Sequence, residues 1–132
     1  MFRFFVTSDT NIETGVANAR HDFMTTEFYK FIENQNYGES LAGLVIVFMC
    51  RSPELIFKRR LRFSKKDKIL SMDIMLDYNL FVNISPDERV IELCKALLLA
   101  LPEVLKKYKF KDFDSDKLMT NLESWFVNHN FI

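Results

Sequence analysis

The spacing of apolar residues along the chain predicts strands and helices in the order β-α-β-β-β-α-α. Residues 2–8 alternate as a strand does, and the T-x-x-E pattern from Thr10 to Glu13 is typical of a helix N-terminus, because each end of the motif satisfies a backbone N–H of the other. We expect this first helix to end at 36–38, with an apolar stripe of Met24, Phe28, Phe31 and Ile32.

Three strands are expected in the middle of the chain. Residues 41–50 are continuously apolar and rich in β-branched side chains, which is typical of a central strand covered on both faces. Residues 55–63 and 69–80 alternate between apolar and polar, and the links between the three segments are short. Successive strands with short links usually pair with one another, so we expect an antiparallel meander.

The last third of the chain is predicted to be helical. Ser85, Pro86 and Glu88 form a capping box with proline in the first turn, and the helix that follows should kink or restart at Pro102. A final helix is expected over residues 115–128. The whole chain, 1–132, is therefore predicted to be one α+β domain: a two-layer sandwich with a four-stranded, mostly antiparallel sheet and helices on one face.

The hairpin made by residues 55–80 contains a strongly basic run, "FKRRLRFSKKDK" at 57–68. A loop at 65–68 has the length that brings the apolar residues of the two strands opposite one another. It places Phe63 opposite Leu70 and Arg60 opposite Asp73. The other charges of the outer face then lie on diagonals, namely Lys58, Arg62 and Asp77.

Two interpretations of this outer face stay open at this point. It is either a solvated ladder of opposite charges or a protein-binding surface, and the apolar Ile56 and Met75 among the charges favour the second. The loop residues Lys65 and Lys66 have no acid opposite them, so they are suited to steering an anionic partner.

The composition of the chain argues against a protein dedicated to nucleic-acid binding. Lys plus Arg number 18 and so do Asp plus Glu, with a pI of about 6.7, whereas such binders usually carry a basic excess. Cys50 and Cys94 lie in apolar stretches and are expected to be reduced core thiols of a cytoplasmic protein. We expect neither a signal peptide nor a membrane span, because no apolar run approaches the roughly 20 residues that a spanning helix needs.

No pattern in the sequence predicts catalysis, a cofactor or a metal. The acids of "DFDSDKLMTNLE" have the spacing of a calcium loop, but Lys117 stands where the sharp turn needs glycine. Acids before a helix N-terminus are expected from the helix dipole alone. The histidines, His21 and His129, are far apart in the chain and match no metal or relay spacing.

The segments "FRFFVTSDT", "SMDIMLDYNLFVNISPDERVIELCKALL" and "FKDFDSDKLMTNLESWF" together resemble the immunity proteins of bacterial polymorphic toxin systems, including those of contact-dependent growth inhibition. The resemblance implies a small non-enzymatic cytoplasmic protein that binds the C-terminal domain of one cognate toxin and blocks it. A nucleic-acid-binding accessory protein that uses the hairpin 57–68 is the alternative. We expect a monomer or a weak homodimer.

The partner-binding residues are predicted on the outer face and tip of the hairpin, with the acidic stretch before the last helix as a second choice. The predicted residues are Lys58, Arg60, Arg62, Lys65, Lys66, Asp73, Asp77, Asp112, Asp114 and Asp116.

Overall fold

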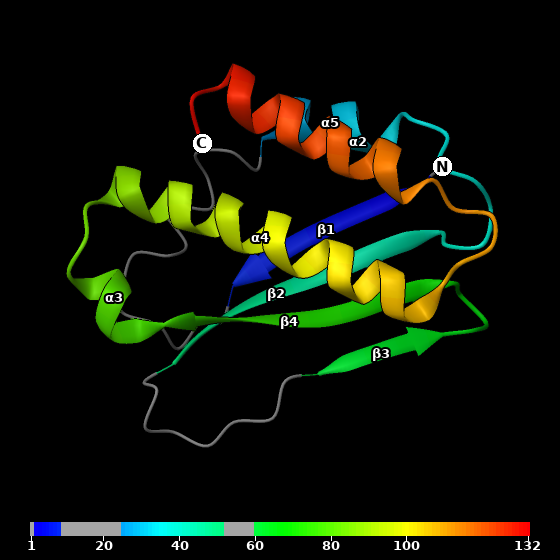
Figure 1. The fold of residues 1–132 in the computed structure, drawn as a ribbon, viewed down its shortest axis with the longest axis horizontal. Helices are drawn as coiled ribbons and strands as arrows, with labels where there is room; N and C mark the ends of the chain where they lie inside the picture. Colours follow the sequence, from blue (N-terminus) through cyan, green and yellow to red (C-terminus); the bar gives the residue numbers. More distant parts are fainter. Residues whose placement is uncertain (1, 9–24, 52–59) are drawn as a thin grey trace.

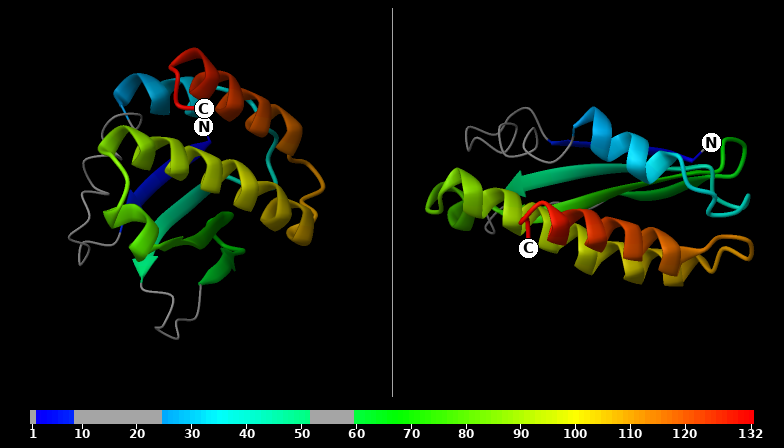
Figure 2. Two further views of the ribbon diagram at one scale, coloured as in Figure 1. Left: turned by 60° about the vertical axis from the view of Figure 1, so that its left-hand side comes forward. Right: turned by 90° about the horizontal axis from the view of Figure 1, so that it is seen from above.

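The computed structural model describes residues 2–8, 25–51 and 60–132. Their elements are β1 (Arg3–Ser8), α2 (Thr26–Glu33), β2 (Gly43–Arg51), β3 (Leu61–Ser64), β4 (Ile69–Asp77), α3 (Tyr78–Val82), α4 (Pro86–Tyr108) and α5 (Ser115–Asn128). The strands form one sheet, and α4 and α5 lie side by side on one face of it (Figures 1 and 2). The predicted α+β class, with helices on one face of a four-stranded sheet, is confirmed.

The sheet is mixed, and the expected meander of successive strands is wrong. The strand order is β1-β2-β4-β3, with β1 parallel to β2, β2 parallel to β4, and β3 antiparallel to β4. β4 is an inner strand, and its residues from Ile69 to Leu76 are all buried or partly buried. β3 is short and carries the exposed Arg62, which suits an edge strand.

The register of the β3–β4 hairpin is confirmed. Leu61 pairs with Met72 and Phe63 with Leu70, as the matching of apolar residues requires. The loop is the expected one at 65–68, and it closes through a hydrogen bond of 2.7 Å from the Lys68 N–H to the Ser64 carbonyl oxygen. The part of the predicted strand before Arg60, including Lys58, lies outside the described residues, as does the capping motif at Thr10 to Glu13.

The core lies between the sheet and the helices and is built from alternate strand residues. The even-numbered apolar residues of β1, β2 and β4 point toward α4 and α5 and are buried. They meet the apolar stripes that the sequence predicts on these helices. The buried residues of α4 and α5 are Val90, Leu93, Cys94, Leu97, Leu101, Leu105, Leu118, Leu122 and Phe126.

The helix predictions of the last third hold with two corrections. The capping box is present, with Ser85 accepting from the Glu88 N–H at 3.2 Å, and α5 has the predicted bounds. α4 does not restart at Pro102 but continues to Tyr108. Residues 78–80 are helical rather than part of β4, because Asp77 caps α3 by accepting a hydrogen bond of 2.9 Å from the Asn79 N–H.

The outer edge of β1 is closed by α2, which lies along it (Figure 2). The Phe4 N–H donates to Oε2 of Glu33 at 2.9 Å, and the Tyr29 hydroxyl donates to the Val6 carbonyl oxygen at 3.4 Å. These bonds occupy backbone groups that would otherwise offer a template for another strand. The β1 edge of the sheet is therefore occupied, which leaves its second face and the β3 edge accessible to a partner.

Candidate functional site

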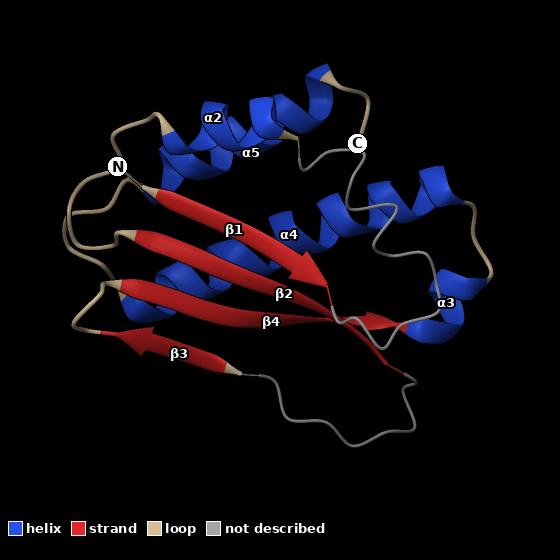
Figure 3. Ribbon diagram, turned by 180° about the vertical axis from the view of Figure 1, so that it is seen from behind, coloured by secondary structure: helices blue, strands red, loops and turns tan. Residues whose placement is uncertain are grey.

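The face of the sheet opposite α4, which we call the open face, is not crossed by any described helix (Figure 3). The strand register assigns to it the odd-numbered residues of β1, β2 and β4 and the even-numbered residues of β3. Its members with described side chains are Arg3, Phe5, Thr7, Gly43, Val45, Val47, Met49, Ile69, Ser71, Asp73, Met75, Asp77, Arg62 and Ser64. The expectation that the strand over 41–50 is covered on both faces therefore holds, among described helices, for one face only.

Most of the charges exposed on the described part of the open face are positive, and the exposed acid, Asp77, lies at the end of β4, where it caps α3. Arg3 and Arg62 are exposed, and so is the side chain of Arg60, which precedes β3 at the same face. The acid next to them, Asp73, is only 4% exposed. The prediction of a solvated ladder of opposite charges is therefore wrong for Asp73, because its carboxylate is withdrawn from the surface.

Asp73 acts instead as a hydrogen-bond acceptor for the backbone of the hairpin. Its Oδ2 accepts the Arg60 N–H at 2.9 Å, and its Oδ1 lies 3.5 Å from the Arg60 guanidinium without a hydrogen bond to a described residue. A buried carboxylate is tolerated when a cation and a donor face it. The predicted pairing of Arg60 with Asp73 is thus present, and it leaves Arg60 largely exposed at 69%.

The hairpin tip, Lys65 to Lys68, lies at the end of the molecule where the acidic stretch also lies (Figure 1). Lys65 and Lys66 are exposed. Lys68 donates to the Glu39 carbonyl oxygen at 3.3 Å, and the Glu39 N–H in turn donates to Oδ2 of Asp112 at 3.2 Å. The structure therefore links two regions that the sequence treats as separate candidates.

Three of the acidic candidates have structural roles. Asp112 joins the segment after α2, since its carbonyl oxygen accepts the Ser40 N–H at 3.1 Å and its own N–H donates to the Ser40 hydroxyl at 2.6 Å. Asp114 caps α5 through the Lys117 N–H at 3.0 Å, and Asp77 caps α3. Asp116 is exposed in the first turn of α5. These contacts, together with the helix dipole, explain why acids occur before and within the first turn of α5 without invoking a bound ion.

A hollow of about 450 Å³ lies on the open face over the start of β2. Gly43 is part of its lining, and Arg3 packs closely on it, since a Cβ at Gly43 would stand 2.8 Å from the Arg3 carbonyl oxygen. Arg3, Phe5, Val45 and Ile69 line it. Phe5 is 56% exposed, which is unusual for a phenylalanine in a strand. The sequence prediction missed this hollow, although the alternation that buries Phe4 also puts Phe5 on the outside.

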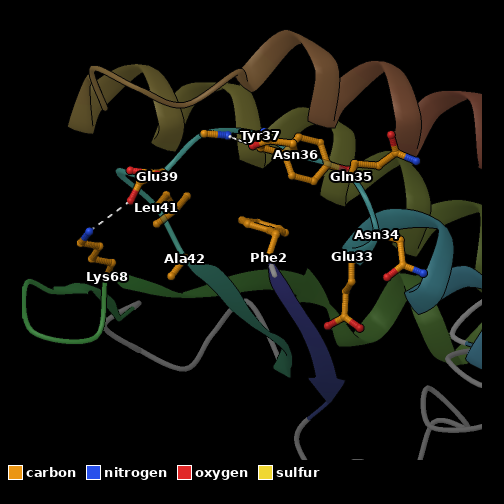
Figure 4. Close-up of a pocket in the computed structure, with 11 residues that line it drawn as sticks. Phe2, Glu33, Asn34, Gln35, Asn36, Tyr37, Glu39, Leu41, Ala42 and Lys68 are labelled. Atoms are coloured by element: carbon orange, nitrogen blue, oxygen red, sulfur yellow. Dashed lines mark hydrogen bonds between the residues drawn. The ribbon is translucent and has the colours of Figure 1, made fainter.

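A second hollow, of about 580 Å³, lies between the end of α2 and the start of β2 (Figure 4). The Phe2 ring lies near its centre, with Glu33 and Lys68 on opposite sides. Its polar groups are largely engaged, because Glu33 binds β1, Lys68 binds Glu39 and the Tyr37 hydroxyl donates to the Ile32 carbonyl oxygen at 2.7 Å. Burial raises the pKa of Tyr37, against a smaller lowering by Asn121, so its hydroxyl stays protonated at neutral pH.

The cysteines and the possible metal ligands of the described residues can be considered in turn. Cys50 and Cys94 are free and buried, and burial raises the pKa of the Cys94 thiol far above neutral pH, so it is not an activated nucleophile. Over residues 2–8, 25–51 and 60–132, His, Cys, Asp and Glu form no cluster of three that could hold a metal ion. Within the same ranges, no helix is long and apolar enough to cross a membrane.

Comparisons with known proteins place the chain in a family. No curated protein and no solved structure matches it. The family model described as Immunity protein 44 matches residues 3–128, which include every described strand and helix. The chain therefore belongs to the immunity protein 44 family.

Proposed function

We propose that the protein binds a cognate toxin domain through the open face and neutralises it by contact, without catalysis. Family membership supports an immunity function, and the open face supports the mode of action. We further propose that it acts in the cytoplasm, where the free thiols of Cys50 and Cys94 would stay reduced.

The observation that carries this proposal is the mixture of apolar and cationic residues on the open face. Val45, Val47 and Met49 are only half-buried, and Phe5 is mostly exposed. Contiguous apolar surface of this kind on a sheet usually marks an interaction site. Aromatic residues, methionine and arginine are the types enriched where proteins meet.

The partner-binding residues that remain in the proposal are those that lie at this face and at the hairpin tip. Arg60 and Arg62 are exposed near the apolar residues of the open face, and Lys65 and Lys66 are exposed at the hairpin tip. Asp73 contributes by holding the start of β3 in place. Asp116 stays as an exposed candidate, whereas Asp77, Asp112 and Asp114 are held by caps and loop contacts at the ends of the sheet.

Titration of the toxin domain with the purified protein tests the non-catalytic mode. A suitable toxin is the C-terminal domain encoded next to this protein. We expect residual toxin activity to fall linearly with added protein and to vanish near one equivalent, because a tight inhibitor acts by occupancy. The measurement is toxin activity after short and long incubation, which should agree.

A progressive loss of toxin activity at far less than one equivalent would contradict the proposal, because only a catalyst acts repeatedly. Absence of binding by the wild-type protein to its neighbouring toxin would contradict it as well. Nucleic-acid binding by the basic hairpin is the alternative, and it predicts an affinity that falls steeply with salt because phosphate contacts release counterions.

A further inference from the structure

The hollow over Gly43 has the features of a receptor for one side chain of the partner. Gly43 lines it without adding a side chain, and stands opposite Arg3 on one neighbouring strand and Ile69 on the other. The next row across the sheet is Phe5, Val45, Ser71 and Arg62 in that order. A depression therefore lies beside an exposed aromatic ring at the end of the open face where β1, β2 and β4 begin.

The lining of the hollow selects an apolar group. Phe5, Val45 and Ile69 supply apolar walls, and the single acid at the rim, Glu33, already accepts the Phe4 N–H through Oε2. An apolar group placed between these walls would remove both its own apolar surface and theirs from water. A branched aliphatic or aromatic side chain is the group that such a space favours.

The surroundings of the hollow select negative charge. Arg3 lies at its edge, Arg62 ends the adjacent row, and Arg60 lies beyond it. Of the acids that β4 places on this face, Asp73 is buried, and Asp77 lies at the far end of the strand, where it caps α3. The described open face thus presents mainly cations on the side of the hollow, although the whole chain has a formal net charge of zero. Charge complementarity then requires carboxylates on the surface that docks there.

We propose, as a refinement that rests on the toxin-binding function above, that this hollow receives one apolar side chain from an acidic surface of the toxin domain. Arg3 and Arg62 pair with carboxylates on either side of that side chain. Buried anchors surrounded by a charged rim carry most of the binding energy in protein interfaces, so Phe5 and the hollow should dominate the affinity. The rim arginines should act mainly on the rate of association.

Two changes test the two parts of this proposal, with the neighbouring toxin domain as the probe. Phe5→Ala is expected to weaken binding about thirtyfold, mostly through faster dissociation, because it removes one wall of the hollow. Its matched control is Leu99→Ala, which truncates an apolar residue that is 75% exposed on the opposite side of the molecule, on α4, and should change the affinity less than about twofold.

Arg3→Glu combined with Arg62→Glu is expected to lower the association rate about tenfold or more at low salt and to weaken its dependence on salt. The matched control is Lys95→Glu combined with Lys106→Glu, which makes the same change in net charge at exposed positions of α4. Circular dichroism and urea unfolding confirm that each variant is folded, and surface plasmon resonance gives both rates.

The outcomes separate this inference from the function on which it rests. If wild-type protein does not bind the toxin, both fail. If it binds and Phe5→Ala binds equally well, the toxin docks elsewhere and the hollow has no role. Unchanged or faster association after the arginine reversal would show that the docking surface is not acidic. Self-association that Phe5→Ala abolishes would assign the hollow to a second copy, and tight RNA binding by the wild type would assign the face to nucleic acid.

Discussion

Phe28→Ala is expected to lower the free energy of unfolding by about 3–5 kcal/mol, the loss typical of truncating a buried aromatic side chain. The Phe28 side chain is fully buried, with its ring centroid 5.9 Å from that of Phe4, 5.7 Å from that of Trp125 and 6.0 Å from that of Phe126. It therefore joins α2, β1 and α5, and its removal leaves a cavity that these three elements cannot all close. Urea unfolding at an unchanged m-value measures the loss.

The matched control for this change is Phe5→Ala, which removes the same atoms from an exposed position of β1. It should shift the free energy of unfolding by no more than about 0.5 kcal/mol. Equal losses for the two variants would mean that the open face is packed as tightly as the core, and the proposed docking surface would then be untenable.

Gly38→Ala is expected to lower the free energy of unfolding by about 3 kcal/mol, because both the backbone and the space reject a Cβ. Gly38 has φ of 106°, and a Cβ there would collide with the carbonyl group of Asp112. The Asp112 carbonyl oxygen is itself held by the Ser40 N–H, so it cannot move without breaking the contact between the segment after α2 and the start of α5. Thermal and urea unfolding measure the loss.

Glu39→Ala is the control for Gly38→Ala, since it changes an exposed neighbour whose described bonds are made by its backbone. It should alter stability by about 0.5 kcal/mol or less. A Gly38→Ala variant as stable as the wild type would show that the 37–40 segment adapts freely. The hairpin tip, which is tied to the same segment through Lys68, would then lack the fixed position that the structure gives it.

The sequence predicted most helices and strands well, because the patterns that indicate them lie within short segments of the chain. The capping box at Ser85 and the stripe of Leu118, Leu122 and Phe126 are each contained within a few turns of helix. The hairpin register followed from apolar matching across a short loop. The error at 78–80 has a local cause too, since Asp77 begins a short helix where alternation alone continues the strand.

The sheet order could not be predicted by assuming that neighbours in sequence pair. β2 and β4 are parallel partners although β3 comes between them in the chain. Two signals favoured this order: the helix between β1 and β2 is typical of a parallel pair, and the charges of β3 suit an edge. Pairing across an intervening strand is a non-local choice, which is decided by how completely β4 can be buried.

The candidate site was predicted in part, because alternation assigns faces but not burial. Arg60, Arg62 and Asp73 do lie together, yet Asp73 is withdrawn into the structure by its bond to the Arg60 N–H. Phe5 was overlooked because its neighbours Phe4 and Val6 made the strand look like core alone. The hollow depends on Gly43 standing between Arg3 and Ile69, which only the sheet order brings about.

Hydroxyl-radical footprinting of the protein with and without its toxin domain tests the central claim most directly, since it reports which face the partner covers. Phe5, Met49 and Met75 are reactive side chains on the open face, and Leu99 and Val127 are exposed on α4 and α5. The account predicts that toxin protects Phe5, Met49 and Met75 and leaves Leu99 and Val127 as reactive as before. Protection of Leu99 and Val127 with an unchanged open face would contradict it.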